Sequence, residues 1–492
     1  MNVLRLNIIS NVAGKLWNIL IGLAFIAIYL RLLGAEAYGL VAFFTMLLST
    51  LQILEFGLGT TINRELARYS ISSKNARDAR DLSRTMEEIY FLVAICIGGA
   101  LVLAAPALAT GWLRVQTLPL STVTTAVAEM GIAIALLWPC SLYNNGLIGL
   151  ERQALQNIIG TVLYTLRTVG AVGALIFFGR SIEIYFLWQI IFGFVQLAVL
   201  AFFFWRFMPH SPERPRFQFA QLRRIWRFTL GLGATGLVSF VLSQMDKVLL
   251  SRMLPLVLFG YYGVANQFNI ASRMLPNALF TAFFPRFSAL IAQGNETEVR
   301  RLYHRGCQFV SLVVFPAAMT GVFFASQVIR IWTGSPQIAQ AAGPIASVLL
   351  LGSAFNSVMG TPYNVTVARG WTSFGFYNGL VSAIFFGPVI VVLVTAYGGL
   401  GAAIAWALLN CGYLAISAPI IHARVLRGEL KTWYLTDVGS GFLASTAVPC
   451  IVKLALPADI SPWLTIVCVG STWAASTICC ALALPETRQF TV

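Results

Sequence analysis

Residues 8–33 read IISNVAGKLWNILIGLAFIAIYLRLL, and only Lys15 and Arg31 in this run are charged. An α-helix needs about 20 residues to cross the roughly 30 Å hydrocarbon core of a bilayer, so this run is long enough to span it. Similar runs recur along all 492 residues, of which 58% are hydrophobic and 10% charged. The sequence therefore predicts an all-α polytopic membrane protein with about 14 transmembrane helices.

Basic residues alternate between the two sides of these predicted spans. The spans are 8–33, 38–63, 88–110, 122–148, 156–178, 183–206, 228–253, 257–284, 305–328, 341–367, 373–397, 399–422, 436–456 and 462–484. With the N-terminus placed inside, the cytoplasmic segments carry 23 of the 33 Lys and Arg residues and the outer loops carry 6. The positive-inside rule then places both termini in the cytoplasm. Because the excess positive charge lies in loops beside helices, we expect it to contact anionic membrane lipids and no nucleic acid.

Two short motifs recur at nearly the same offset. The stretch 31–40, RLLGAEAYGL, resembles the stretch 252–261, RMLPLVLFGY, and the dipeptide Tyr-Asn at 143–144 recurs at 363–364. The offset from 31 to 252 equals the offset from 143 to 363 to within one position. We interpret these matches as a duplicated six-helix unit. Because six is an even number, the two copies are parallel repeats about an axis along the membrane normal, an arrangement that commonly encloses a central cavity.

The duplication divides the chain into four predicted parts. An N-terminal six-helix lobe covers 1–206, and a proline-interrupted basic linker covers 207–227. A C-terminal six-helix lobe covers 228–425, and an additional two-helix hairpin covers 426–492. The predicted architecture is therefore two pseudo-symmetric six-helix bundles plus a C-terminal helix pair.

Seven ionisable side chains lie inside predicted spans, where insertion of a charge costs about 2.5–3.5 kcal/mol. Several share polar stripes on one face of a helix, and we expect stripes on equivalent helices to face one hydrated cavity. The candidate cavity or substrate-binding residues are Asn11, Lys15, Asn18, Arg167, Asp246, Lys247, Asn269 and Arg273. The candidate ion-coupling residues are Glu55, Glu129 and Asp246.

A structural role is the alternative for all of these residues. Small polar side chains also mediate helix packing, and buried charges also form pairs, such as Glu55 with Arg273 or Lys15. Adjacent helix residues point about 100° apart, so we expect Asp246 and Lys247 to form no tight pair and each to have its own partner. The sequence leaves the two interpretations open.

The motifs do not favour an enzyme. His210, His304 and His422 lie in or near predicted cytoplasmic loops, and the sequence contains neither a phosphate-binding loop nor an HExxH motif. The eight cysteines lie in or at the ends of spans without CxxC or Cys/His spacing, so we expect neither disulfides nor a metal site. These observations predict a transporter without a cofactor.

Five short segments resemble a known family. They are 33–40 (LGAEAYGL), 55–59 (EFGLG), 63–65 (NRE), 243–250 (SQMDKVLL) and 259–262 (FGYY). They resemble bacterial oligosaccharide-lipid flippases, the polysaccharide transporter branch of the multidrug/oligosaccharidyl-lipid/polysaccharide exporter superfamily. The twelve-plus-two helix count is similar as well.

The resemblance implies translocation of an undecaprenyl-diphosphate-linked glycan from the cytoplasmic to the periplasmic leaflet of the bacterial inner membrane, for O-antigen, capsule or exopolysaccharide assembly. It implies a basic cavity, to which Lys15, Asp246, Lys247 and Arg273 would correspond. It also implies coupling to an H⁺ or Na⁺ gradient, and a glycan polymerase or other assembly proteins as partners. This sequence has three acidic and four basic residues inside predicted spans, so it differs from the strongly cationic cavity that the resemblance implies.

Two other functions stay open. A cation-coupled drug exporter of the same fold would depend on the acidic residues rather than on the basic ones. A membrane-embedded glycan polymerase or ligase would need an outer catalytic loop, and the longest predicted outer loops, 111–121 and 329–340, contain one Arg each. Replacing Lys15 or Arg273 by Ala would abolish surface glycan only if the chain is a flippase.

Overall fold

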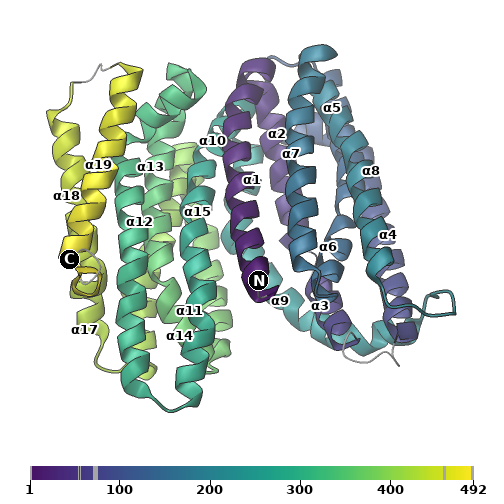
Figure 1. The fold of residues 1–492 in the computed structure, drawn as a ribbon. Helices are drawn as coiled ribbons and strands as arrows, with labels where there is room; N and C mark the ends of the chain where they lie inside the picture. The colour runs from purple at the N-terminus through teal and green to yellow at the C-terminus, as the bar shows by residue number, and fades with distance from the viewer. Residues whose placement is uncertain (1–2, 54, 56, 70–75, 458–460, 489–492) are drawn as a thin grey trace. The chain divides into compact units, whose positions relative to one another are not determined.

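The computed structural model of the chain describes residues 3–53, 55, 57–69, 76–457 and 461–488, without the side chains of 3–12, 15, 224–232, 234 and 235. Within these ranges every assigned element is helical, as the sequence predicts (Figure 1). The helices form two compact units, residues 1–260 and 261–492, called unit 1 and unit 2 below.

Unit 1 is a bundle of helices in which α5 packs on both α4 and α8, and α1 packs on α7. Its helices are α1 (Val3–Leu33), α2 (Ala35–Ile53), α3 (Leu58–Tyr69), α4 (Ala76–Ala107), η2 (Leu108–Trp112), α5 (Leu120–Leu137), α6 (Cys140–Gly149), α7 (Gln153–Phe177), α8 (Ile182–Phe207), α9 (Phe219–Met253) and the start of α10 (Leu256–Ser272). Its core centres on Tyr90, Tyr143 and Phe204, which are almost fully buried.

Unit 2 is built around α12, which packs on α11, α13, α18 and α19. Its helices are the rest of α10, then α11 (Met274–Ala292), α12 (Glu296–Thr333), α13 (Pro336–Val358), α14 (Gly360–Ala368), α15 (Thr372–Gly412), η3 (Tyr413–Ser417), α16 (Ala418–Arg424), α17 (Leu430–Thr432), η4 (Trp433–Gly439), α18 (Ser440–Ala455), α19 (Pro462–Ala483) and α20 (Pro485–Arg488). Its core includes Tyr303, Phe315 and Trp433. Trp433 lies in η4, so the segment after the second predicted lobe contributes directly to this core.

Twelve helical segments of the described chain are long and apolar enough to cross a membrane. One of them, 372–424, contains two predicted spans, because α15 breaks at Gly398, which has a φ of 58°. The predicted seventh span falls in α9, a helix of 35 residues. Leu103, Phe177 and Leu454 are more than four-fifths exposed, as lipid-facing side chains are. The chain is a multi-pass membrane protein, and the predicted count of about 14 spans is approximate.

Four predicted spans are interrupted in the structure. The breaks separate α2 from α3, α5 from α6, α10 from α11, and α13 from α14. The starts of these helices are separated by the same offset as the sequence motifs. This offset separates the start of α2 at Ala35 from the start of α10 at Leu256. It also separates the start of α6 at Cys140 from the start of α14 at Gly360, to within one position. Equivalent helices of the two repeats are therefore discontinuous at equivalent places. Such broken helices are tolerated in membranes where the freed backbone groups lie inside the protein.

The predicted linker 207–227 belongs to unit 1. Asp81 of α4 fixes it, because its carboxylate accepts hydrogen bonds from the backbone N–H of Arg216 at 2.8 Å and from Gln218 Nε2 at 2.6 Å. α9 then packs on α2, α3 and α4. The compact unit consequently extends to Gly260, beyond the predicted end of the first lobe at 206, and the lobe boundaries stay predictions.

Candidate functional site

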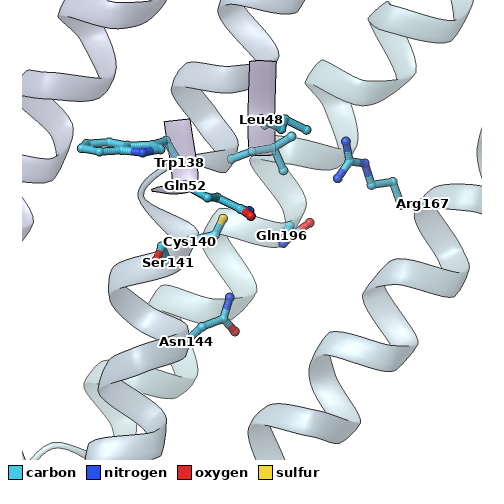
Figure 2. A pocket seen from close by; sticks show the side chains of 9 residues that line it. Leu48, Gln52, Trp138, Cys140, Ser141, Asn144, Arg167 and Gln196 are labelled. Carbon is cyan, nitrogen blue, oxygen red and sulfur yellow. The ribbon is translucent and has the colours of Figure 1, made fainter. Parts of the chain in front are cut away.

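A hollow of about 180 Å³ lies inside unit 1, and Figure 2 shows the side chains that surround it. They come from α2, from the α5–α6 region, from α7 and from α8. The polar ones are Gln52, Ser141, Asn144, Arg167 and Gln196. At about 30 Å³ per water molecule, the hollow has room for about six waters or for one small polar group.

The break between α5 and α6 shapes one wall of this hollow. Pro139 cannot donate a backbone N–H, and α5 ends two residues before it at Leu137. The new helix α6 begins at Cys140 and directs Ser141 and Asn144 to the hollow. The intramembrane proline that the sequence contains at this position thus marks a change of direction that exposes polar side chains inside the bundle.

Arg167 supplies the positive charge at this hollow. Its Nε group donates a hydrogen bond to the side-chain oxygen of Gln189, and its guanidinium carbon lies 5.9 Å from the centre of the Phe44 ring. No carboxylate partner for Arg167 exists among the described residues. An intramembrane cation without a counter-charge is expensive, so its position beside a polar hollow indicates a functional role.

Neutral amide groups add to the donor capacity of the hollow. Asn144 accepts a hydrogen bond of 3.2 Å from Gln156 through its side-chain oxygen, which leaves its NH₂ group available. The amides of Gln52 and Gln196 have no hydrogen-bond partner within the part of the chain that is described. None of the described residues that line the hollow is acidic. A fixed cation with several neutral donors is chemically suited to an anionic or hydroxyl-rich group.

Glu55, a predicted ion-coupling residue, lies close by. Its carboxylate accepts hydrogen bonds from the hydroxyl groups of Tyr90 and Ser141, with distances of 3.0 and 2.9 Å from Ser141 Oγ to the two carboxylate oxygens. Glu55 is 9% exposed. Ser141 therefore connects the buried acid to the hollow that contains Arg167.

A second polar cluster lies in unit 2 and joins α10, α13 and α15. Asn269 donates a hydrogen bond of 3.0 Å to Asn266, and its side-chain oxygen accepts one from Ser353. Trp406 Nε1 donates to Ser353 Oγ at 3.3 Å. The guanidinium carbon of Arg273 lies 5.6 Å from the centre of the Trp406 ring. The structure thus brings together two of the predicted residues, Asn269 and Arg273, through a tryptophan that the sequence analysis did not select.

Arg273 lies at the break between α10 and α11 rather than inside a continuous helix. Like Arg167, it has an aromatic ring and no carboxylate partner among the described residues. Cation–π contacts stabilise a charge by about 0.5–2 kcal/mol, which is less than its insertion cost. Each unit therefore contains an intramembrane arginine that an aromatic ring stabilises only in part.

The prediction that Asp246 and Lys247 would form no tight pair is wrong. Lys247 Nζ lies 3.0 Å from Asp246 Oδ1 and 3.1 Å from Oδ2, and it also donates to the carbonyl oxygen of Ser243 at 2.8 Å. The reason is the flexible four-carbon stem of lysine, which reaches back across the angle of about 100° between adjacent positions. Both side chains are less than one-fifth exposed, so the pair is nearly neutral as seen from outside it.

The remaining predicted residues do not join these clusters in the described structure. Asn18 Oδ1 and Glu129 Oε2 are buried without a hydrogen-bond partner among the described residues. The side chains of Asn11 and Lys15 lie outside the described part of the chain. Their predicted roles in binding and ion coupling stay predictions.

Sequence reasoning missed the aromatic and amide residues around the arginines. Trp406 and Gln189 contact the two guanidinium groups, and Gln196 lines the hollow of unit 1. Gln189 and Gln196 are two helical turns apart on α8, so they share a helix face inside an otherwise apolar run. This spacing could have identified the two glutamines as candidate site residues from the sequence. For Trp406 the sequence offers no comparable signal, because aromatic residues are common throughout the spans.

The described residues contain no group of three or more His, Cys, Asp and Glu residues that could hold a metal ion. The chemistry of the two clusters is that of charge and hydrogen bonding. They can bind and orient a polar group inside the membrane.

The chain is similar to known proteins over nearly its whole length. The family model described as "Polysaccharide biosynthesis protein" matches residues 4–291, and the MatE model matches residues 232–393. A protein of Shigella flexneri named "Putative O-antigen transporter" is 21% identical over 406 residues, which cover 81% of this chain and 94% of that protein.

Solved structures share the fold. The lipid II flippase MurJ in an inward closed conformation superposes with a TM-score of 0.77 at 11% identity, over 98% of this chain and 99% of that chain. An inward-facing multidrug resistance MATE family transporter of the MOP superfamily gives a TM-score of 0.67 at 13% identity, over 89% of this chain and 96% of that one.

Together, the helical architecture and these similarities define a transporter of the multidrug/oligosaccharidyl-lipid/polysaccharide exporter superfamily. Within this class, the chain belongs to the polysaccharide biosynthesis protein family, whose model matches more than half of it.

Proposed function

We propose that the chain is a flippase that moves an undecaprenyl-diphosphate-linked oligosaccharide from the cytoplasmic to the periplasmic leaflet of the bacterial inner membrane. Membership of the polysaccharide biosynthesis family and similarity to an O-antigen transporter support this substrate class. The observation that carries the proposal is the pair of intramembrane arginines, Arg167 and Arg273, without carboxylate partners among the described residues.

The physical problem of the proposed substrate matches this chemistry. A diphosphate is at least doubly negative and a glycan is heavily hydrated, so neither crosses hydrocarbon unaided. Arginine presents a planar fork of donors that binds phosphate oxygens in pairs. The amides beside Arg167 supply the hydrogen bonds that sugar hydroxyls lose when they leave water. We place both termini in the cytoplasm, because the basic loops lie on that side under the positive-inside rule.

A cation-coupled drug exporter is the second candidate, because the MatE model matches residues 232–393. For either function, Glu55 is our candidate for coupling to an H⁺ or Na⁺ gradient. Its carboxylate is buried and held by the neutral hydroxyls of Tyr90 and Ser141, so a bound proton or cation would change the local charge. In a drug exporter this acid would be essential and the arginines incidental.

Transbilayer movement in vesicles tests the proposal directly. The protein is reconstituted with an undecaprenyl-diphosphate-linked oligosaccharide that carries a fluorescent label on the sugar, and a quencher reports the outer leaflet. Arg167→Gln and Arg273→Gln should each weaken apparent affinity about 10- to 150-fold, because a hydrogen bond to a charged group contributes about 1.5–3 kcal/mol. Arg301→Gln is the matched control, because Arg301 is 70% exposed and pairs only with Glu298 among the described residues.

Three results decide between the candidates. Movement by the parent protein that is lost in both arginine variants and kept in the control supports the flippase. Equal movement of the labelled lipid by the parent protein, the two arginine variants and the control would show that Arg167 and Arg273 do not bind the substrate. If only a lipophilic cation moves under an imposed H⁺ or Na⁺ gradient, and Glu55→Gln abolishes this movement, the drug exporter is correct.

A further inference from the structure

An apolar groove of about 310 Å³ lies on unit 2, between the two halves of α15 and the π-helical segment η3. This volume is at the lower end of the range of about 300–1,000 Å³ that is typical of small-molecule sites. Both halves contribute residues at helical spacing, namely Ser382, Phe385 and Val389 before the break in α15 and Ala405, Leu409 and Gly412 after it. Two helix faces are therefore directed toward one groove.

The groove is open to the side. A β-carbon added to Gly412 would meet nothing within 4 Å, so the neighbouring helices do not fill the space at this position. Val381, Phe385 and Ile416 also line the groove, and each is more than half exposed. In a chain that crosses a membrane many times, such apolar side chains face lipid. The groove consequently opens toward the hydrocarbon of the bilayer.

Contacts between the helices limit the groove at both ends. Near the break in α15 the two halves touch, because a β-carbon added to Gly401 would overlap the carbonyl oxygen of Leu393. At the other end, Ser417 Oγ donates a hydrogen bond of 2.7 Å to Asn378 Oδ1. The lining residues from 378 to 389 cover about 16 Å of helix. One leaflet contributes about 15 Å of the hydrocarbon core, so the groove is about one leaflet long.

The polar lining residues lie toward one end of the groove. They are Asn378, Ser382, Tyr413 and Ser417, on the helix ends that the sequence predicts to be cytoplasmic. Asn378 accepts the hydrogen bond from Ser417 through its side-chain oxygen, which leaves its NH₂ group available. A polar group that enters hydrocarbon needs a hydrogen-bond partner. This arrangement therefore suits a hydrocarbon chain with an ester group at its polar end.

A positive charge lies just beyond the polar end. Arg424 ends α16, about 10 Å beyond Ser417 along the helix, and the headgroup layer is about 5–8 Å thick on each side of the membrane. Its side chain is exposed, and its guanidinium carbon lies 4.3 Å from the centre of the ring of Trp371, which precedes α15. No carboxylate pairs with Arg424 in the described part of the chain. Tryptophan is enriched at membrane interfaces, so Trp371 and Arg424 mark the headgroup level.

We propose that this groove binds one acyl chain of an anionic diacyl phospholipid of the cytoplasmic leaflet, with the anionic headgroup against Arg424. The length of the groove fits the chain, and the hydroxyl and amide groups at its polar end fit the ester. The cytoplasmic leaflet is rich in anionic lipids, which attract basic residues near the surface. The proposal goes beyond the proposed function, because the lipid is a bound component of the membrane and is not the transported molecule.

Photo-crosslinking with a lipid probe tests the site. The full-length protein is placed in phosphatidylcholine nanodiscs with a phosphatidylglycerol that carries a diazirine in one acyl chain, and crosslinked peptides are identified by mass spectrometry. In the parent protein, crosslinks should concentrate in 378–389 and 405–417. Gly412→Trp, which fills the groove, should reduce them at least about tenfold. Gly470→Trp in α19 is the matched control, because a β-carbon there also meets nothing within 4 Å and Gly470 does not line the groove.

A second pair of variants tests the headgroup contact. Arg424→Gln should lower crosslinking by the phosphatidylglycerol probe about fivefold, which corresponds to about 1 kcal/mol. Crosslinking by a phosphatidylcholine probe with the same diazirine chain should stay unchanged. Arg301→Gln is the control, because Arg301 is an exposed arginine of α12 that pairs with Glu298. Equal losses for both probes, or no loss for either, would overturn the assignment of the anionic headgroup to Arg424.

Competition in the parent protein keeps the test decisive if Gly412→Trp does not accumulate. Excess unlabelled phosphatidylglycerol should displace the probe, and phosphatidylcholine should not. Crosslinks spread evenly over α15 and α19, or unchanged by the competitor, would overturn the site. Stronger displacement by an equal amount of undecaprenyl phosphate would assign the groove to a polyprenyl chain instead, and a dimer that Gly412→Trp dissociates would assign it to a second copy of the chain. The assay uses no glycan, so its outcome is independent of whether the protein moves one.

Discussion

Replacing Asp437 by Ala will weaken the attachment of the C-terminal helix pair to α12. The Asp437 side chain is fully buried in η4, and its Oδ2 atom lies 2.5 Å from His304 Nδ1 of α12. Its Oδ1 atom accepts a hydrogen bond of 2.9 Å from Gln308 Nε2. His304 Nε2 lies 3.0 Å from Glu429 Oε2. One carboxylate therefore satisfies two side chains on another helix, the buried Gln308 and the partly exposed His304.

The expected cost follows from this geometry. Removal of one partner of a buried charged pair costs about 3–5 kcal/mol. The lower end, about 3 kcal/mol, applies here, because His304 keeps Glu429 at Nε2 while its Nδ1 atom and Gln308 Nε2 lose their acceptor. For a domain of about 150–250 residues, each kcal/mol lowers the melting temperature by about 2–4 °C, so Asp437→Ala should lower the Tm by about 6–12 °C. Asp437→Asn should cost less, because the amide oxygen still accepts a hydrogen bond from Gln308.

Thermal unfolding of the purified protein in detergent measures this effect. Glu298→Ala is the control, because Glu298 pairs with Arg301 at 3.3 Å and both side chains are exposed, so the change should cost about 0–1 kcal/mol. A melting temperature of Asp437→Ala equal to that of Glu298→Ala would refute the assignment of a stabilising buried pair. A drop of similar size for Asp437→Asn would mean that charge, rather than hydrogen bonding to Gln308, dominates.

Two further substitutions test the packing of the helices. Gly401→Ala should sharply reduce accumulation of the protein in the membrane, because the new β-carbon would overlap the carbonyl oxygen of Leu393. Gly412→Ala is the control and should accumulate normally, because a β-carbon there meets nothing within 4 Å. Equal amounts of the two variants on an immunoblot would contradict this prediction. Glu36→Ala should free the loop around Thr117, since three backbone donors lose their acceptor at about 1–3 kcal/mol each, and limited proteolysis from the outside should cut there faster than in the parent protein.

Hydrophobic runs alone predicted the all-helical, multi-pass fold. A bilayer leaves backbone polar groups no partner except within a helix, so long apolar runs decide the secondary structure locally. The repeat also followed from the sequence, because two motifs that recur at the same offset can be found by comparing the chain with itself. Those runs did not reveal that four spans are broken, since the apolar residues resume after each break, as they do on both sides of Met359.

Individual contacts of the polar residues depended on tertiary structure. The pairing of Lys247 with Asp246 went against an expectation from helix geometry, because side-chain length outweighed the angle between positions. Similarly, Trp406 beside Arg273 and Gln189 beside Arg167 come from helices other than those that carry the arginines.

From its sequence alone, this protein is determined to cross the membrane many times and to carry two related halves, because hydrophobicity and internal repetition are properties of the chain itself. Only the tertiary structure decided which polar side chains meet, that Gly39 and Gly260 touch across the two motif copies, and which arginines lack a carboxylate among the described residues. The physical reason is that a contact between distant segments depends on helix breaks and close packing, which composition does not encode.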